Sequence, residues 1–436
     1  MRSGRKDLRN LAALFLVAPA AFAVTLGEAV GYAVENRGDV EAAWSSVESA
    51  GWGRRSADLW FLPVVSGSIA FQRSSDVQEL TVPGMGSFPM GSEYASQVGL
   101  TATLPLYAPI GPAGASLSRE AEGLARSQAM STEQDAVLQV VQAFYGVLLA
   151  QRMVDVSAEA LSIAEQGLEI ARQKYEAGTI SRFELLQSQV AYENRIPDDI
   201  SARNALENAR AGLAVAMGLP DSSSVVPEGS LEDPLPVALP ESLGAARAVM
   251  LAHSPDLSAA EGMRGVGHAG VGMARAGFAP TVVLSTSYDY VAARDDWRFN
   301  ENDYSRSWNT VLSLSIPIFS GLGDFASYNS ARADMAASDS RARAVEQAAG
   351  LQLVQAWNDL CEARERVTAT TATASEAEEG SEIARVSYEA GVITRLDMDQ
   401  ALLALTAART NTATALYSLR TAEARLARAM GTLEIE

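Results

Sequence analysis

Few residues in this chain of 436 amino acids could support catalysis, nucleotide binding or metal binding. Gly265, Gly267 and Gly270 match G-x-G-x-x-G, a pattern that binds a pyrophosphate when a strand precedes it and a helix follows. Here a helical pattern precedes it and a strand pattern follows it, so we exclude a dinucleotide site. The only histidines, His253 and His268, are too few for a histidine-based metal site or a catalytic triad.

Cysteine chemistry is equally limited, because Cys361 is the only cysteine. A single cysteine excludes an intrachain disulfide and a multi-cysteine metal site. Under the internal repeat described next, Cys361 aligns with Leu148, and we expect a small core residue rather than a reactive thiol. The many carboxylates follow patterns typical of solvated helix faces. The sequence therefore predicts a protein that is not an enzyme and has no catalytic, cofactor-binding or metal residues.

The dominant pattern in the chain is an internal repeat with an offset of 213 residues. Residues 171–182 return as residues 384–395, and the match continues without a gap to the Ala-x-Met-Gly ends at Gly218 and Gly431. A fixed period makes each half one structural unit. Neither half has the pattern of a compact core, so the repeat predicts a shared tubular assembly rather than a globular enzyme.

The first 23 residues read as a secretory signal peptide. Arg2, Arg5, Lys6 and Arg9 precede an apolar run, which ends at the Ala21-Phe22-Ala23 cleavage pattern. No later run approaches the roughly 20 apolar residues of a spanning helix. No cysteine follows the cleavage site until Cys361, so we expect no lipid anchor at the mature N-terminus.

The charge balance is strongly acidic. The whole chain has a formal net charge of −19, and without the signal peptide 30 basic and 52 acidic residues remain, which gives −22. This balance argues against nucleic acid as a partner.

The prolines divide the chain into two repeats joined by a linker. None occurs between Pro112 and Pro197 or after Pro317, whereas five lie within residues 219–241. Since proline breaks helices, we predict long helices on either side of a linker at 219–241. The domains are thus the signal peptide 1–23, the first repeat 24–218, the linker, and the second repeat 242–436.

Each repeat has the same predicted order of elements: a helix, two strands and two very long helices. Thr25, Ser242, Ser181 and Thr394 are good helix N-caps, and Gly178 and Gly391 suit helix ends that require positive φ. Pro197 predicts a kink in the second long helix of the first repeat. The predicted strands are 62–72, 96–107, 280–291 and 306–319, and the predicted long helices are 113–177, 181–217, 321–390 and 394–433.

The strands alternate between apolar and polar residues, which suits either a half-buried sheet or transmembrane strands around a watery lumen. Flanking aromatic residues favour the membrane, since they resemble the girdles of transmembrane barrels. These are Trp60, Phe61, Tyr107, Tyr288, Tyr290, Trp308 and Phe319. Because four strands cannot close a barrel and open edges are not tolerated in lipid, several copies must combine; three would give twelve strands.

These features together resemble the TolC-type outer-membrane efflux proteins (outer membrane factors) over essentially the whole mature chain. The resemblance rests on the duplicated motif Tyr-x-x-Gly-x-x-[ST]-x-x-[DE]-[LM] at 175–185 and 388–398, on the two Ala-x-Met-Gly ends, and on the strand-ending sequences at 104–107 and 316–319. It implies a mainly α fold with a small β part. Long antiparallel hairpins would form an α-barrel, and four strands per chain would close a trimeric twelve-stranded β-barrel.

The resemblance also implies a function, a location and partners. The homotrimer would lie in outer-membrane lipid and extend into the periplasm, as the passive exit duct of a tripartite efflux or type I secretion system. A periplasmic adaptor (membrane fusion) protein and an inner-membrane pump would complete the system. The family brings no cofactor and no catalytic residue.

The resemblance implies a periplasmic constriction at the second hairpin tip. Asp397 matches the entrance-ring aspartate and Tyr388 the tyrosine of the gate network, while Glu184 takes the equivalent place in the first repeat. Gln400 stands where a second aspartate is expected, with Asp399 beside it, and Ile393 stands where the gate arginine is expected, with Arg395 close by. Tyr175, Gly178 and Gly391 mark the tips that would dock the adaptor.

Three Asp397 carboxylates around a narrow lumen would repel one another, raise their pKa values and favour cations. The alternative is that Asp397 is a solvated first-turn acid, favoured by the helix dipole. Two other functions also stay open: a periplasm-bridging structural or adhesive coiled coil without channel activity, and an exported hydrolase.

Overall fold

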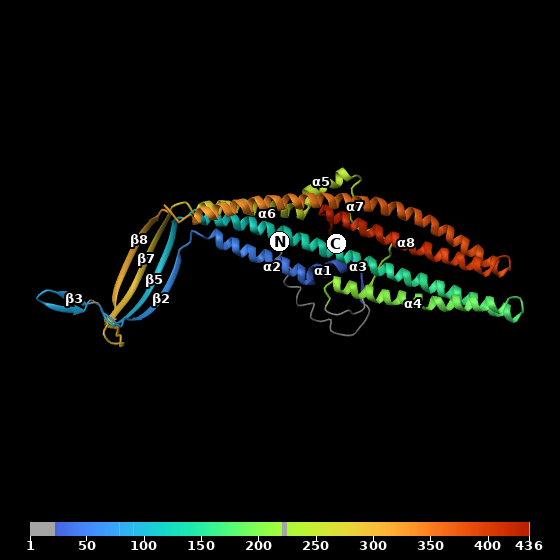
Figure 1. Cartoon of the computed structure of the whole chain (residues 1–436), viewed down its shortest axis with the longest axis horizontal. Helices are drawn as coiled ribbons and strands as arrows, with labels where there is room; N and C mark the ends of the chain where they lie inside the picture. Colours follow the sequence, from blue (N-terminus) through green and yellow to red (C-terminus); the bar gives the residue numbers. More distant parts are fainter. Residues whose placement is uncertain (1–21, 78, 90, 220–224, 436) are drawn as a thin grey trace. The chain divides into compact units, whose positions relative to one another are not determined.

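The computed structural model describes residues 22–77, 79–89, 91–219 and 225–435, and Figure 1 shows its helices and strands. The chain divides into two compact units. One unit, here called the strand unit, comprises residues 46–126 and 259–344. The other, the hairpin unit, comprises residues 127–258 and 345–436 together with the chain before residue 46. Each unit draws on both repeats, so the duplication does not correspond to two separate domains.

The strand unit contains a four-stranded antiparallel sheet. Its order is β2-β5-β7-β8, with bounds β2 Val64–Arg73, β5 Tyr94–Tyr107, β7 Thr281–Arg294 and β8 Ser305–Ser315. All four predicted strands are present. The last was predicted to reach residue 319 but ends at Ser315, because Pro317 has no N–H for a ladder bond.

The register of this sheet sorts its side chains onto two faces. Residues directly opposite each other share a face, and Ser68, Gly99, Asp289 and Ser307 form one such row across the sheet. The polar face carries Ser66, Ser68, Gln97, Thr101, Thr103, Ser285, Ser287, Asp289, Ser307, Asn309 and Ser313. The opposite face carries Val65, Ile69, Phe71, Val98, Leu100, Leu104, Val282, Leu284, Tyr288, Tyr290, Trp308, Leu312 and Leu314.

Two short pairs of strands were not predicted. Strands β3 Glu79–Val82 and β4 Gly86–Pro89 form a hairpin between β2 and β5, where no strand was predicted. Strand β1 Phe22–Val24 pairs in parallel with β6 Val225–Pro227, which lies in the predicted linker. The predicted signal peptide covers residues 1–23: residues 1–21 lie outside the described residues, and Phe22 and Ala23 belong to β1.

Helix α2 Gly38–Asp58 precedes β2, and helix α6 Pro255–Ala276 precedes β7. Helix α6 contains the G-x-G-x-x-G pattern. Gly265, Gly267 and Gly270 all lie inside α6, so no strand directly precedes them. A Cβ at Gly267 would stand 3.2 Å from Met335 Cα. This glycine therefore allows close helix packing and does not form a phosphate loop.

The hairpin unit is built from long helices whose bounds lie within three residues of the predictions. They are α3 Ile110–Glu176, α4 Arg182–Ala216, α7 Gly323–Glu389 and α8 Arg395–Met430, of which α3 and α7 begin in the strand unit. The shorter helices α1 Leu26–Asn36 and α5 Leu243–His253 complete the unit. Pro197 lies inside an uninterrupted α4, and the kink stays a prediction.

The predicted N-caps are confirmed. Thr25 and Thr394 each form a capping box with the acid three residues later, and the hydroxyls of Ser181 and Ser242 accept from the backbone N–H groups of Glu184 and Ala245. A side chain that satisfies an orphan N–H fixes the first turn of a helix.

The hairpin unit has two apolar clusters. Val140, Val141 and Phe144 of α3 pack in the first with Leu213 of α4, and Leu353 and Leu360 of α7 pack in the second with Leu426 and Met430 of α8. One expectation is wrong here: Cys361 is exposed, because the neighbouring Leu360 takes the inward position. By length and composition alone α3 could cross a membrane, and 39% of its most apolar window is buried in the chain.

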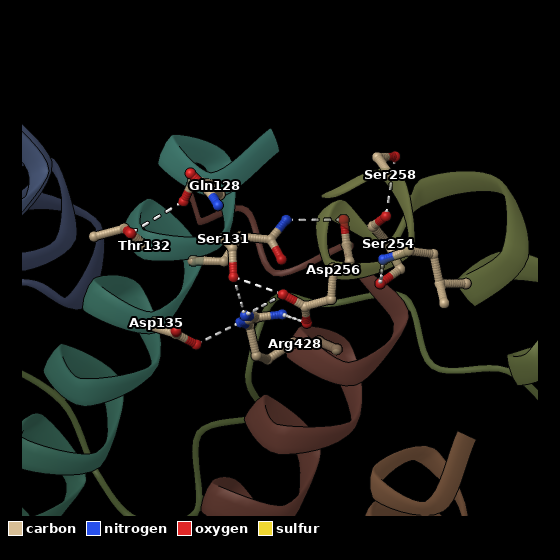
Figure 2. A network of polar contacts seen from close by, with 12 residues as sticks. Gln128, Ser131, Thr132, Asp135, Ser254, Asp256, Ser258 and Arg428 are labelled. Carbon is tan, nitrogen blue, oxygen red and sulfur yellow. Dashed lines mark hydrogen bonds and ion pairs between the residues drawn. The ribbon is translucent and has the colours of Figure 1, made fainter. Parts of the chain in front are cut away.

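A polar network joins α3, α6 and α8 within the hairpin unit (Figure 2). Arg428 donates to Asp256 Oδ2 at 2.9 Å and to Asp135 Oδ1 at 2.6 Å, and Ser131 donates to Asp256 Oδ1 at 2.6 Å. Burial raises the pKa of Asp256, but the hydrogen bonds and charge from Arg428 and Ser131 outweigh it, so its pKa lies below the usual range. The network therefore holds the start of α6 and the end of α8 against the middle of α3.

Candidate functional site

The two hairpin tips have the same backbone geometry. Gly178, between α3 and α4, has φ +76°, and Gly391, between α7 and α8, has φ +74°. Each glycine N–H donates to the carbonyl of the tyrosine three residues earlier, at 2.9 Å to Tyr175 and 3.1 Å to Tyr388. Glycine is needed because other residues reach positive φ only with strain. Each helix therefore reverses within a few residues, which places the side chains that follow at the tip.

Asp397 acts as a helix cap in the protomer. Its Oδ2 accepts from the Thr394 backbone N–H at 2.9 Å and from the Thr394 hydroxyl at 2.6 Å. The hydrogen bond from the Thr394 side chain, followed by that from its backbone, lowers the pKa of Asp397. Its carboxylate is exposed. The raised pKa predicted for three facing copies concerns the assembly and stays a prediction.

Three of the predicted gate residues come together at the second tip. Arg395 is only 6% exposed, and its Nη2 lies 2.8 Å from Asp399 Oδ1. Its guanidinium carbon lies 5.9 Å from the centre of the Tyr388 ring, and Tyr388 is also 6% exposed. A cation over an aromatic face and a close carboxylate both favour this position of the arginine.

Two residues of α3 that the sequence reasoning missed complete this cluster. Lys174 Nζ donates to the Tyr388 carbonyl at 3.0 Å and lies 4.2 Å from the Tyr388 ring centre. Gly167 lies against the Arg395 guanidinium so closely that a Cβ there would overlap Nη1. The two hairpins are therefore held together at the tip by Tyr388, Arg395, Asp399, Lys174 and Gly167, here called the tip latch.

The other predicted tip residues do not join the latch. Glu184, Gln400 and Tyr175 are exposed. The Glu184 backbone N–H donates to the Ser181 hydroxyl at 3.3 Å, as expected for a first-turn residue. They are therefore free to face another copy or a partner.

A second cluster, also missed, lies farther along the hairpins. Arg409 of α8 pairs with Glu159 of α3 and, at 2.9 Å, with Glu378 of α7. These residues line a cavity of about 230 Å³ between the three helices. Its ionic lining fits a hairpin contact rather than an apolar ligand. No group of three or more His, Cys, Asp or Glu residues in the described parts of the chain could hold a metal ion.

The sheet has two open edges. Within the described parts of the chain, strand β2 pairs only with β5 and strand β8 only with β7, and every residue of both edge strands is exposed. Trp308 is 73% exposed and Phe71 is 73% exposed on the apolar face. A sheet with one polar face, one apolar face and unpaired edges has the pattern of a partial transmembrane barrel.

The whole chain is similar to known outer-membrane channels. The model of the outer membrane efflux protein family matches residues 29–219 and 248–432. The alkaline protease secretion protein AprF of Pseudomonas aeruginosa is 28% identical, over 97% of this chain and 87% of AprF. The cation efflux system protein CusC of Escherichia coli is 24% identical over 68% of this chain and 64% of CusC.

The fold agrees with solved structures of such channels. A membrane protein from Pseudomonas aeruginosa superposes with a TM-score of 0.79 at 20% identity, covering 93% of this chain and 90% of that one. A crystal structure of CusC gives a TM-score of 0.78 at 20% identity, covering 96% and 95%. This chain therefore belongs to the outer membrane efflux protein family, as a channel that spans the outer membrane and reaches into the periplasm.

Proposed function

We propose that three copies of the chain form one exit duct, to which each contributes four strands and two long helical hairpins. The open sheet edges carry this proposal. In lipid, unpaired backbone groups are too costly to persist, so β8 of one copy must pair with β2 of the next. Both strands are fully exposed in the protomer, and they run antiparallel across such a seam. Three copies give twelve strands with the polar face inside.

The hairpin tips form the periplasmic entrance and dock an adaptor. Exposed apolar residues gather at both tips: Phe183 is 68% exposed and Leu186 47% on α4, and Val392 is 76% and Leu396 65% exposed beside α8. Apolar patches of this kind, rimmed by polar residues, mark interaction surfaces. Tyr175, Gly178 and Gly391 shape these tips, and the adaptor would connect them to an inner-membrane pump.

The entrance is closed by the tip latch, and Asp397 and Glu184 face the lumen beside it. Among the described residues, Arg395 has one carboxylate partner, and its Nε and Nη1 are buried without a hydrogen-bond partner. A buried arginine that is only partly satisfied is held weakly. The latch therefore suits an entrance that must open when the pump and adaptor engage.

The proposed function is that of an exit duct, and no particular cargo is assigned to it. Relatives with this architecture are named for protease secretion, as AprF, and for cation efflux, as CusC. A common duct serves both. The coiled-coil and hydrolase alternatives have no comparable support.

The current through purified protein in planar bilayers tests the duct and the acidic entrance together. We expect ohmic steps whose preference for K⁺ over Cl⁻ falls at least about threefold in Asp397→Asn, because three carboxylates leave the entrance. Asparagine keeps an oxygen for the Thr394 cap. Thr394→Ala is the matched control: it removes the capping hydroxyl and keeps the charge, so the preference should stay.

Two results would count against this account. Silence of the wild-type protein at every concentration would exclude the duct. The second result is an ohmic current whose preference for K⁺ over Cl⁻ is unchanged in Asp397→Asn but altered in Thr394→Ala. It would show that Asp397 is only a helix cap.

A further inference from the structure

The polar face of the sheet carries a single charge. Among the described residues of β2, β5, β7 and β8, the side chains on this face are small, polar or aliphatic, except Asp289. The arginines of these strands, Arg73, Arg294 and Arg306, have the opposite parity and belong to the other face or its rim. The negative charge of Asp289 therefore has no compensating cation on its own face.

The neighbours of Asp289 hold its carboxylate in place. Gly99 stands directly opposite on β5, and a Cβ there would overlap Asp289 Oδ1. Gln97 Nε2 donates to the same oxygen at 3.3 Å. The glycine thus opens the space into which the carboxylate leans, and the glutamine orients it. Ser307 lies opposite on β8, at the seam edge.

We propose that Asp289 makes the β-barrel lumen selective for cationic solutes. This inference rests on the proposed trimer, in which three copies of Asp289 form one ring. Twelve strands spaced about 4.8 Å apart and tilted about 40° give a barrel radius of about 12 Å, so the carboxylates lie roughly 8–9 Å from the axis. That distance is close to the Debye length of about 10 Å at 0.1 M salt. The ring therefore acts across the whole lumen.

The effect has a characteristic dependence on salt. A solute at Ser307 is about 5–6 Å from the nearest Asp289 carboxylate. At that distance Coulomb attraction in water concentrates a monovalent cation over a matching anion about fivefold at 0.1 M salt, and less than about twofold at 1 M. Selectivity that comes from shape or hydrogen bonding would not collapse with salt in this way.

Thiol labelling measures this field without depending on the periplasmic entrance. The background is Cys361→Ser, which removes the only native thiol, with Ser307→Cys as the reporter. The purified protein in lipid nanodiscs is labelled with cationic trimethylammonium-ethyl or anionic sulfonatoethyl methanethiosulfonate. We expect the ratio of cationic to anionic rates to be about fivefold higher with Asp289 than with Asp289→Asn at 0.1 M salt, and the difference to fall below about twofold at 1 M.

Two controls isolate the ring. Ser313→Cys lies on the same strand and face as Ser307→Cys but six residues away, which is about 20 Å. Its ratio of labelling rates should therefore be the same with Asp289 and with Asp289→Asn. Asp76→Asn removes one exposed charge per chain from the loop after β2 and should leave the ratio at Ser307→Cys unchanged.

The outcomes separate this inference from the proposed duct. Two results would overturn the inference and leave the proposed duct intact. In the first, the ratio of cationic to anionic labelling rates at Ser307→Cys is the same with Asp289 and with Asp289→Asn. In the second, Asp76→Asn changes this ratio as much as Asp289→Asn does. If neither reagent labels Ser307→Cys while both label the denatured protein, the polar face does not line an open lumen. That result would overturn the duct and the inference with it.

Discussion

Gly167→Ala should raise the time-averaged current through the purified channel about tenfold or more, although it replaces no charged residue. The new Cβ would occupy the place of Arg395 Nη1, which is the far end of a flexible side chain and can move away. The arginine would then lose its contacts with Asp399 and Tyr388. A charge-assisted hydrogen bond contributes about 1.5–3 kcal/mol, and about 1.4 kcal/mol already shifts a closed–open equilibrium tenfold. Arg395→Ala should act in the same direction.

The fold should tolerate this change, which makes the test specific. Alanine is a better helix former than glycine by about 1 kcal/mol, so α3 should not weaken. Gly146→Ala is the matched control on the same helix, because no atom lies within 4 Å of its Cβ position. The measurement is the time-averaged current per channel in planar bilayers, which reports the open fraction. Equal averaged current in the wild type, Gly167→Ala and Gly146→Ala would exclude the tip latch as the closure.

Gly431→Ala should destabilise the hairpin unit by about 3 kcal/mol or more. Gly431 ends α8 with φ +79°, and an added Cβ would lie 2.5 Å from the His253 carbonyl oxygen and 2.7 Å from Ser254 Cα. These are backbone atoms and cannot swing away. Left-handed backbone costs a non-glycine residue about 1–2 kcal/mol, and overpacking adds about 1–3 kcal/mol.

Gly391→Ala separates the two contributions. Gly391 has φ +74° and open space at its Cβ position, so only the backbone cost of about 1–2 kcal/mol applies. Denaturant unfolding followed by the helical circular dichroism signal measures both variants. If Gly431→Ala is no less stable than Gly391→Ala, the close contact between the end of α8 and the end of α5 does not form.

Local signals in the sequence predicted most of the fold. Capping residues such as Thr394, the tip glycines, and the alternation in the strands each act within a few residues, so the sequence alone locates the elements. The strands β1 and β6 were not predicted, because three residues are too few to show a periodic pattern. Cys361 was wrongly predicted to lie in the core. Its alignment with the buried Leu148 does not show how much of α7 is buried in the second repeat.

The site was predicted less completely, since its contacts join distant segments. Arg395 was noted only as a neighbour of the expected position, and the structure buries it against Gly167 and Tyr388. Lys174 and Gly167 come from the other repeat, and no spacing rule relates them to α8. Lys174, the only lysine outside the predicted signal peptide, and a glycine in mid-helix were the available signals, and mid-helix glycines are common elsewhere in the chain.

The most direct test of the account is a disulfide across the seam between copies. In the Cys361→Ser background, one cysteine replaces Ser68 on β2 and a second replaces Ser307, Asn309 or Ser313 in turn on β8. All four lie on the polar face, so one register should bring two thiols within bonding range. We expect that register to give, on a non-reducing gel, a ladder whose largest species is a covalent trimer. Monomer at every register, or a ladder that stops at two or continues past three, would contradict a barrel closed by three copies.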